Sequence, residues 1–250
     1  PNVLEYITAN EVNLCLTIQA YQEAIHSQSY SYILDTICSP EERDEILYLW
    51  RDDERLLARN KFIGDQYNYF LENQNKFALM KTLIANYILE GIYFYSGFMF
   101  FYSLGRIGKM PGTVQEIRYI NRDENTHLWL FRSIILELKK EEPELFTKEK
   151  IEVYRDMIKR GVEEEIDWAR YVYGDEIKGL NMNMIESYIK YLGNLRWRGL
   201  GFEKLYDGCE KEPESMKWVS EYSDPNAIKT DFFEGKPSAY SKSSVIEDDL

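Results

Sequence analysis

Two segments of this chain repeat one spacing of metal-ligating side chains. Glu23 precedes His26 by three residues, Glu124 precedes His127 by three, and these are the two histidines of the sequence. Residues three apart on an α-helix share a face, so each pair presents a carboxylate and an imidazole to the same point. Imidazole nitrogens and carboxylate oxygens together suit a transition-metal ion. The duplicated pair therefore predicts two helices that converge on a metal site.

A dinuclear carboxylate centre in a four-helix bundle also needs one carboxylate from each of two further helices. Glu90 is a candidate for one of them, because it is the single charged residue in the apolar run 83–104. Taken alone, each histidine also fits a hydrogen-bonded core residue, and Glu90 also fits a protonated acid. A buried carboxylate is costly without a partner, so the combination of both pairs with Glu90 favours the metal site.

Composition excludes several classes of partner. A chain of 250 residues with 44% hydrophobic residues is long enough to bury one large core. Its formal net charge of −13 argues against nucleic acid or an anionic membrane surface as partner. The three cysteines have no CxxC spacing, which is typical of a reducing compartment and predicts a cytoplasmic protein.

The run 83–104 is long enough to span a bilayer. Against that reading, an acidic residue in the hydrocarbon costs about 3 kcal/mol on insertion scales. The aromatic residues also fill the interior of the run and do not border it. The run is therefore expected to form one apolar helix at the centre of a bundle, with no contact to a membrane.

Other helices are expected where polar residues and prolines mark their ends. The predicted cap residues are Asn10, Ser39, Thr113, Thr147 and Asn183. One acidic cluster is expected to be a solvated helix face. It consists of Glu163, Glu164, Glu165 and Asp167.

Three motifs together resemble the small, radical-generating subunit of class I ribonucleotide reductase. They are EAIHSQSY (23–30), LEGIYFYSGF (89–98) and RDENTHLWL (122–130), and NMNMIESYIKYLGNLR (181–196) is also similar. The resemblance covers nearly the whole chain. It implies an all-α, ferritin-like helical bundle, a homodimer, and a dinuclear iron centre, with manganese or mixed manganese–iron as alternatives.

The resemblance also implies roles for individual residues. The residues that match metal ligands are Glu23, His26, Glu90, Glu124 and His127. Tyr30 matches the tyrosine that is oxidised to a stable tyrosyl radical, and it lies one helical turn beyond His26. The apolar pocket around that radical is matched by Phe94, Phe98 and Ile120. On the radical-transfer route, the matching residues are Asp123 and Tyr240.

The sequence departs from the family's pattern at its start. The family's first carboxylate ligand and a transfer tryptophan belong to a segment that would precede Pro1. The chain is therefore expected to be N-terminally incomplete or one part of a split subunit, with a separate N-terminal segment supplying the carboxylate. Glu5 is a conceivable substitute, although it does not fit the family's helix.

The expected organisation is a metal-binding domain over residues 1–229 and a flexible tail over 230–250 that docks on the large catalytic subunit. The expected activity is that of a ribonucleoside-diphosphate reductase. The metal centre activates oxygen and generates a radical at Tyr30, which passes to the large subunit for reduction of ribonucleotides to deoxyribonucleotides. One alternative is another ferritin-like di-metal oxidase that acts on a small or fatty substrate without a partner subunit. A storage protein without redox output is a second alternative.

Overall fold

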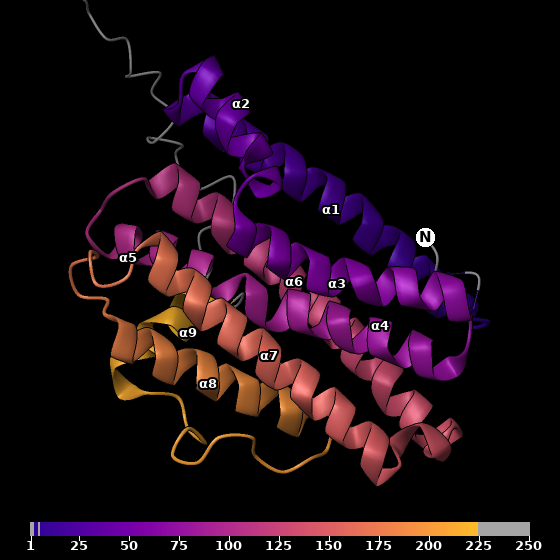
Figure 1. Cartoon of the computed structure of the whole chain (residues 1–250). Coiled ribbons are helices and arrows are strands. Elements are labelled where there is room, and N and C mark those ends of the chain that lie inside the picture. Colours follow the sequence, from indigo (N-terminus) through magenta and orange to yellow (C-terminus); the bar gives the residue numbers. More distant parts are fainter. Residues whose placement is uncertain (1–2, 5, 225–250) are drawn as a thin grey trace, which may run out of the picture.

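The computed structural model describes residues 3–4 and 6–224, and the secondary structure within these ranges is helical (Figure 1). The predicted all-α, ferritin-like class is confirmed. The α-helices are α1 (Asn10–Ile37), α2 (Pro40–Tyr48), α3 (Glu54–Asn73), α4 (Lys76–Ile88), α5 (Tyr95–Arg106), α6 (Pro111–Glu141), α7 (Lys148–Val172), α8 (Met182–Gly199) and α9 (Lys217–Ser223). Short 3₁₀ turns lie at Leu49–Arg51, Pro143–Phe146 and Glu214–Met216.

Helix α4 lies at the centre of the bundle. It packs against α3, α6 and α7, and every residue from Leu83 to Ile88 is buried. A helix surrounded by other helices is apolar on all sides, which explains the composition that also resembled a membrane span. Among the described residues, no helix has the combination of length and hydropathy that crossing a bilayer requires.

The expectation of one continuous helix over 83–104 is wrong. A π-helical segment, Leu89–Tyr93, separates α4 from α5 and carries Glu90. Such π turns shift the register of a helix and occur often at functional sites. The absence of a side chain at Gly91 lets Leu128 and Arg196 pack directly against the backbone of this segment. An added Cβ at Gly91 would lie 2.7 Å from the Leu128 side chain and 2.9 Å from the Arg196 side chain. Arg196 of α8 donates from Nε to the Gly91 carbonyl at 3.0 Å and thereby holds the π segment.

Two of the predicted helix caps are confirmed and three are wrong. Asn10 is the first residue of α1 and Ala9 occupies the cap position. The side chains of Ser39 and Thr147 accept hydrogen bonds from the first turns of α2 and α7. Helix α6 begins at Pro111, before Thr113, because a proline at the first position loses no helical hydrogen bond. Helix α8 is capped by Asn181 and not by Asn183.

Glu165 contradicts the predicted solvated face of α7. Its side chain is fully buried and accepts hydrogen bonds from the Arg59 guanidinium of α3 and from the Ser96 backbone N–H at 2.7 Å. Arg59 donates in addition to the Tyr93 carbonyl at 3.1 Å. The pair therefore ties α3 and α7 to the end of the π segment.

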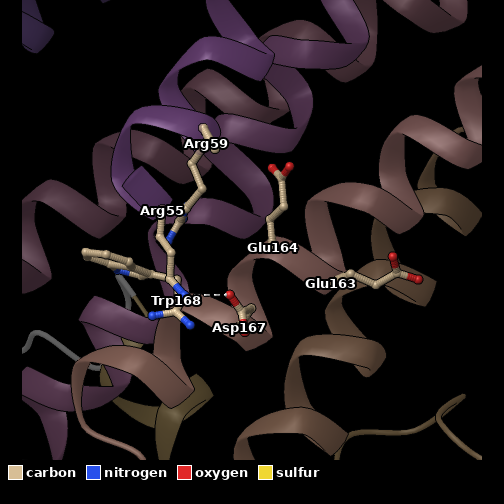
Figure 2. A pocket seen from close by; sticks show the side chains of 7 residues that line it. Arg55, Arg59, Glu163, Glu164, Asp167 and Trp168 are labelled. Carbon is tan, nitrogen blue, oxygen red and sulfur yellow. Dashed lines mark hydrogen bonds and ion pairs between the residues drawn. The ribbon is translucent and has the colours of Figure 1, made fainter. Parts of the chain in front are cut away.

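The other three acids of the predicted cluster border a surface pocket of about 270 Å³. Figure 2 shows Glu164 and Asp167 of α7 beside the arginines of α3, while Glu163 points away from them. Arg55 donates from Nε to Asp167 at 3.2 Å, with both side chains about half exposed. Glu163 and Asp167 are exposed and match the predicted solvated face, whereas Glu164 is half-buried and accepts a hydrogen bond from the Tyr93 hydroxyl.

Candidate metal centre

Three parts of the bundle bring the five predicted metal ligands to one place. They come from α1 (Glu23, His26), the π segment (Glu90) and α6 (Glu124, His127). One ligand atom from each of Glu23, Glu90, Glu124 and His127 lies within 4.8 Å of all the others. His26 lies outside that group of four but next to it, with Nδ1 at 3.1 Å from Glu124 Oε1 and 3.7 Å from Glu23 Oε2.

The cluster is enclosed by the bundle. His26, Glu90, Glu124 and His127 are buried, and Glu23 is half-buried. Helix α1 packs against α6, and the π segment packs against α6 from another side. The sequence positions that converge are therefore separated along the chain and joined only by tertiary packing.

Both imidazoles turn the same nitrogen toward the carboxylates. His127 Nδ1 lies 2.7 Å from Glu124 Oε2, and His26 Nδ1 lies 3.1 Å from Glu124 Oε1. The Nε2 atoms face away from the cluster, toward Asp123 at 3.4 Å for His26 and toward Gln22 at 3.0 Å for His127. A neutral imidazole with its proton on Nε2 has its lone pair on Nδ1, so both rings are oriented for metal binding.

Protonated imidazoles balance the negative charge of the carboxylates when no metal ion is bound. Burial opposes the positive charge of His26 and His127, but the adjacent carboxylates of Glu124 and Glu23 stabilise that charge and outweigh burial. The pKa of His26 is raised to about 10 and that of His127 to about 11. Both imidazoles are therefore positively charged at neutral pH, with a proton on each ring nitrogen. Each must release its Nδ1 proton when a cation binds there.

The three carboxylates divide by environment. Burial would raise the pKa of Glu23, but hydrogen bonds from His127 and His26 hold it at about 2. Burial raises the pKa of Glu90. Burial acts on Glu124 as well, but the adjacent imidazoles of His127 and His26 outweigh it and lower the pKa of Glu124. Glu90 is therefore the carboxylate that keeps a proton, and a cation would displace it.

Two buried atoms in the cluster have no hydrogen-bond partner among the described residues. They are Nδ1 of His26 and Oε2 of Glu90, which lies 3.7 Å from His127 Nδ1. A buried polar atom without a partner costs about 1–3 kcal/mol. Because both atoms are metal-ligand types at the cluster, this observation fits a metal centre.

The described residues supply one carboxylate fewer than a complete dinuclear site. Such sites use two Glu–x–x–His pairs and two further carboxylates, and here Glu90 is the single further one. If both imidazoles are neutral, the negative charge of three carboxylates does not fully balance the positive charge of two divalent cations. The conceivable substitute Glu5 lies outside the described residues.

Tyr30 lies beside the cluster but is not fully enclosed. The residue is 37% exposed. Its pKa is nevertheless raised above the ordinary value, first by burial of the phenol and then by the negative charge of Glu124. The phenol group is therefore buried, and the exposed surface belongs to other parts of the residue.

The predicted apolar pocket residues lie on the two helical segments that flank the cluster. Phe98 and Ile120 are buried and Phe94 is half-buried, with ring centroids of Phe94 and Phe98 6.1 Å apart. Phe98 stacks on Tyr102, which is one of the groups that raise the pKa of Tyr30. Tyr240 lies outside the described residues.

Two glutamines of α1 that the sequence patterns did not single out also contact the cluster. Gln19 is buried and donates from Nε2 to Glu90 Oε1 at 3.0 Å. Gln22 contacts His127, as described above. A signal for Gln22 was present, because it precedes Glu23 by one residue just as Asp123 precedes Glu124.

A hollow of about 490 Å³ adjoins the cluster. Glu23, Glu90 and Gln19 line its polar side, and Leu16 and Phe131 are among its apolar residues. It is large enough for a small molecule such as dioxygen to approach Glu90.

Converging Glu–x–x–His pairs with a further buried glutamate, inside a helical bundle, define the class of ferritin-like dinuclear carboxylate proteins. Within that class, the family model "Ribonucleotide reductase, small chain" matches residues 1–213. The chain belongs to this family, whose members are subunits of an oxidoreductase.

Individual relatives agree with this assignment. The ribonucleoside-diphosphate reductase subunit beta of Treponema pallidum is 69% identical over 250 residues, which are 100% of this chain and 71% of that protein. The ribonucleotide reductase R2 subunit of Clostridium botulinum has a TM-score of 0.85 at 52% identity, covering 90% of this chain and 70% of its own. The dimanganese(II)-NrdF of Streptococcus sanguinis has the same fold, with a TM-score of 0.69 at 20% identity, 89% of this chain and 74% of its own.

Proposed function

We propose that this chain provides the metal-binding and radical-bearing part of a ribonucleoside-diphosphate reductase small subunit. The observation that carries the proposal is the convergence of both Glu–x–x–His pairs with Glu90, beside Tyr30, in a member of this family. The cluster residues hold two metal ions, iron or manganese, and exclude bulk water. When bound, the ions supply the oxidising equivalents from oxygen.

Tyr30 gives up one electron and its hydroxyl proton to form the tyrosyl radical. The pKa of its phenol is raised, so the group is protonated at neutral pH and both particles must leave it. Phe94, Phe98 and Ile120 exclude water and reductants around it. Asp123 accepts a hydrogen bond from His26 and connects this ligand to the radical-transfer route.

A further segment completes the site. Three carboxylates are present where four are needed, and the buried Nδ1 of His26 has no hydrogen-bond partner among the described residues. The partial exposure of Tyr30 also leaves a surface for such a segment to cover. A separate N-terminal segment that carries the fourth carboxylate accounts for both observations.

The radical is used by a large catalytic subunit, which reduces ribonucleotides to deoxyribonucleotides. Residues 230–250 dock on that subunit, and Tyr240 lies on the radical-transfer route. The small subunit itself acts as a homodimer in the cytoplasm. Members of its family serve the supply of precursors for DNA replication.

Electron paramagnetic resonance tests the radical. After ferrous iron and oxygen are added to the complete subunit, a tyrosyl signal is expected, and Tyr30→Phe is expected to abolish it. Tyr32→Phe is the matched control, because Tyr32 is exposed on the same helix and lies outside the metal cluster. Deleting residues 241–250 is expected to abolish reductase activity with the large subunit while the radical signal persists. A full signal in Tyr30→Phe would contradict the proposal.

The di-metal oxidase alternative predicted a substrate channel, and the hollow beside Glu90 is a feature of that kind. Family membership favours the reductase. An oxidase acting alone would keep its activity without the last ten residues, so the same deletion separates the two functions.

A further inference from the structure

The outer nitrogen of each cluster histidine is held by a residue of the opposite helix. His26 of α1 contacts Asp123 of α6, and His127 of α6 contacts Gln22 of α1. Gln22 stands four residues before His26, and Asp123 stands four before His127. The two contacts therefore share one register and are related by the same internal repeat. They differ in charge, because one partner is an amide and the other a carboxylate.

We propose that Gln22 is the positioning residue of His127, and that Gln22 and Asp123 make the two metal positions chemically different. The inference rests on the proposed function, because it concerns the same cluster. The amide oxygen of Gln22 lies 3.0 Å from His127 Nε2 and accepts the N–H of that atom. This fixes the tautomer with the lone pair on Nδ1, which faces Glu124. A reversed amide would donate to Nε2 and place the imidazole proton on Nδ1, where it would block the metal.

The charge difference acts through the imidazoles. A carboxylate that accepts from a ligand histidine makes that ligand more basic, and a neutral amide does so less. Arg122, which lies 3.2 Å from the other oxygen of Asp123, offsets part of this effect but is half exposed to solvent. The ion bound by His26 is therefore the more easily oxidised of the two, and the ion bound by His127 is the less easily oxidised.

Three variants of α1 test this inference. Gln22→Met removes the acceptor at nearly constant size, and Gln22→Glu replaces it with a carboxylate like that of Asp123. Gln28→Met is the matched control, because Gln28 lies on the exposed surface of the same helix. The metal-free subunit is titrated with ⁵⁷Fe-labelled ferrous iron under anaerobic conditions, and the Mössbauer spectrum of the loaded subunit is recorded. Circular dichroism establishes that each variant is folded.

We expect Gln22→Met to weaken the binding of one of the two ions by about 10–100-fold, the usual effect of losing such a partner. One of the two Mössbauer doublets should change and the other should not. Gln22→Glu should restore the affinity and move the changed doublet toward the other one. Gln28→Met should match the unmodified subunit in every respect.

The inference is overturned if Gln22→Met binds both ions with unchanged doublets. If Gln22→Met does not fold, the Gln22→Glu variant provides the test. Unchanged doublets in Gln22→Glu would refute the proposal that the amide and the carboxylate make the two metal positions different. His127→Gln separates this failure from failure of the proposed function. Loss of one ion in His127→Gln supports the site whatever Gln22 does, whereas retention of both ions removes the site itself.

Discussion

His26, His127 and Glu90 hold protons in the positions where metal ions would place positive charge. The raised pKa values of the imidazoles come from carboxylates that a cation would share, and burial raises the pKa of Glu90. Because the folded pKa of His26 exceeds that of an exposed histidine, the protonated pair stabilises the metal-free fold at and below neutral pH. That contribution is lost as the pH rises through about 10.

Metal affinity should increase with pH. Each proton that must leave before a ligand binds weakens the observed affinity by about tenfold per pH unit below its pKa. Anaerobic titration with Mn²⁺ at pH 6, 7 and 8 should therefore give progressively tighter binding. A pH indicator should detect released protons, and His26→Gln should release fewer. An affinity that is constant from pH 6 to 8 would contradict this protonation scheme.

At the scale of elements, the π segment is held from two sides. Arg196 of α8 binds its backbone at Gly91, and the buried Arg59–Glu165 pair binds its end at Tyr93 and Ser96. Burial raises the pKa of Glu165 while the charge of Arg59 opposes it. The pair is therefore costly to bury but strongly destabilising to break on one side.

Glu165→Leu is expected to lower the free energy of unfolding by about 3–5 kcal/mol, because it leaves the Arg59 charge buried and unpaired. Replacing both partners, as Arg59→Met with Glu165→Leu, should recover most of this loss. Asp167→Leu breaks the exposed contact to Arg55 between the same two helices, so it should cost less than about 1 kcal/mol. Urea denaturation measures all three, and equal losses for Glu165→Leu and Asp167→Leu would refute the structural role.

Two glycines, one within the π segment and one just beyond it, test whether this segment is closely packed against its neighbours. Gly91→Ala places a methyl group against Leu128 and Arg196, so it should destabilise by about 1–3 kcal/mol and reduce metal affinity through Glu90. Gly97→Ala in α5 meets nothing within 4 Å and should stabilise by about 0.5–1 kcal/mol. Thermal unfolding and metal titration of both variants check these signs. A stabilising Gly91→Ala would show that the π segment is not closely packed.

At the scale of the whole molecule, α1 has a second face that the described residues do not cover. Leu14, Ile18, Tyr21 and Ile25 are exposed and follow the four–three–four spacing of a helix–helix seam. Helix α1 lies at one edge of the bundle in Figure 1, and the helical register places this face opposite Glu23 and His26. An apolar stripe of this kind marks an interaction surface, and a second copy of the subunit is the partner we expect.

Ile18→Asp is expected to weaken the homodimer by more than about tenfold, because it buries an unpaired charge in the seam. Sedimentation at several concentrations measures the change. Val153→Asp adds the same charge at an exposed apolar position of α7 and should leave the dimer intact. Equal dissociation in both variants would argue that net charge, rather than the α1 seam, governs association.

The sequence determined the helical class, the family, and the five carboxylate and histidine residues that cluster, because helical periodicity and Glu–x–x–His spacing are local properties. It did not determine the π segment or the burial of Glu165, since both depend on what neighbouring helices place against them. The contact of Gln22 with His127 likewise exists because α1 and α6 pack face to face. Local spacing decides which side chains share a helix face, and only tertiary packing decides what that face meets.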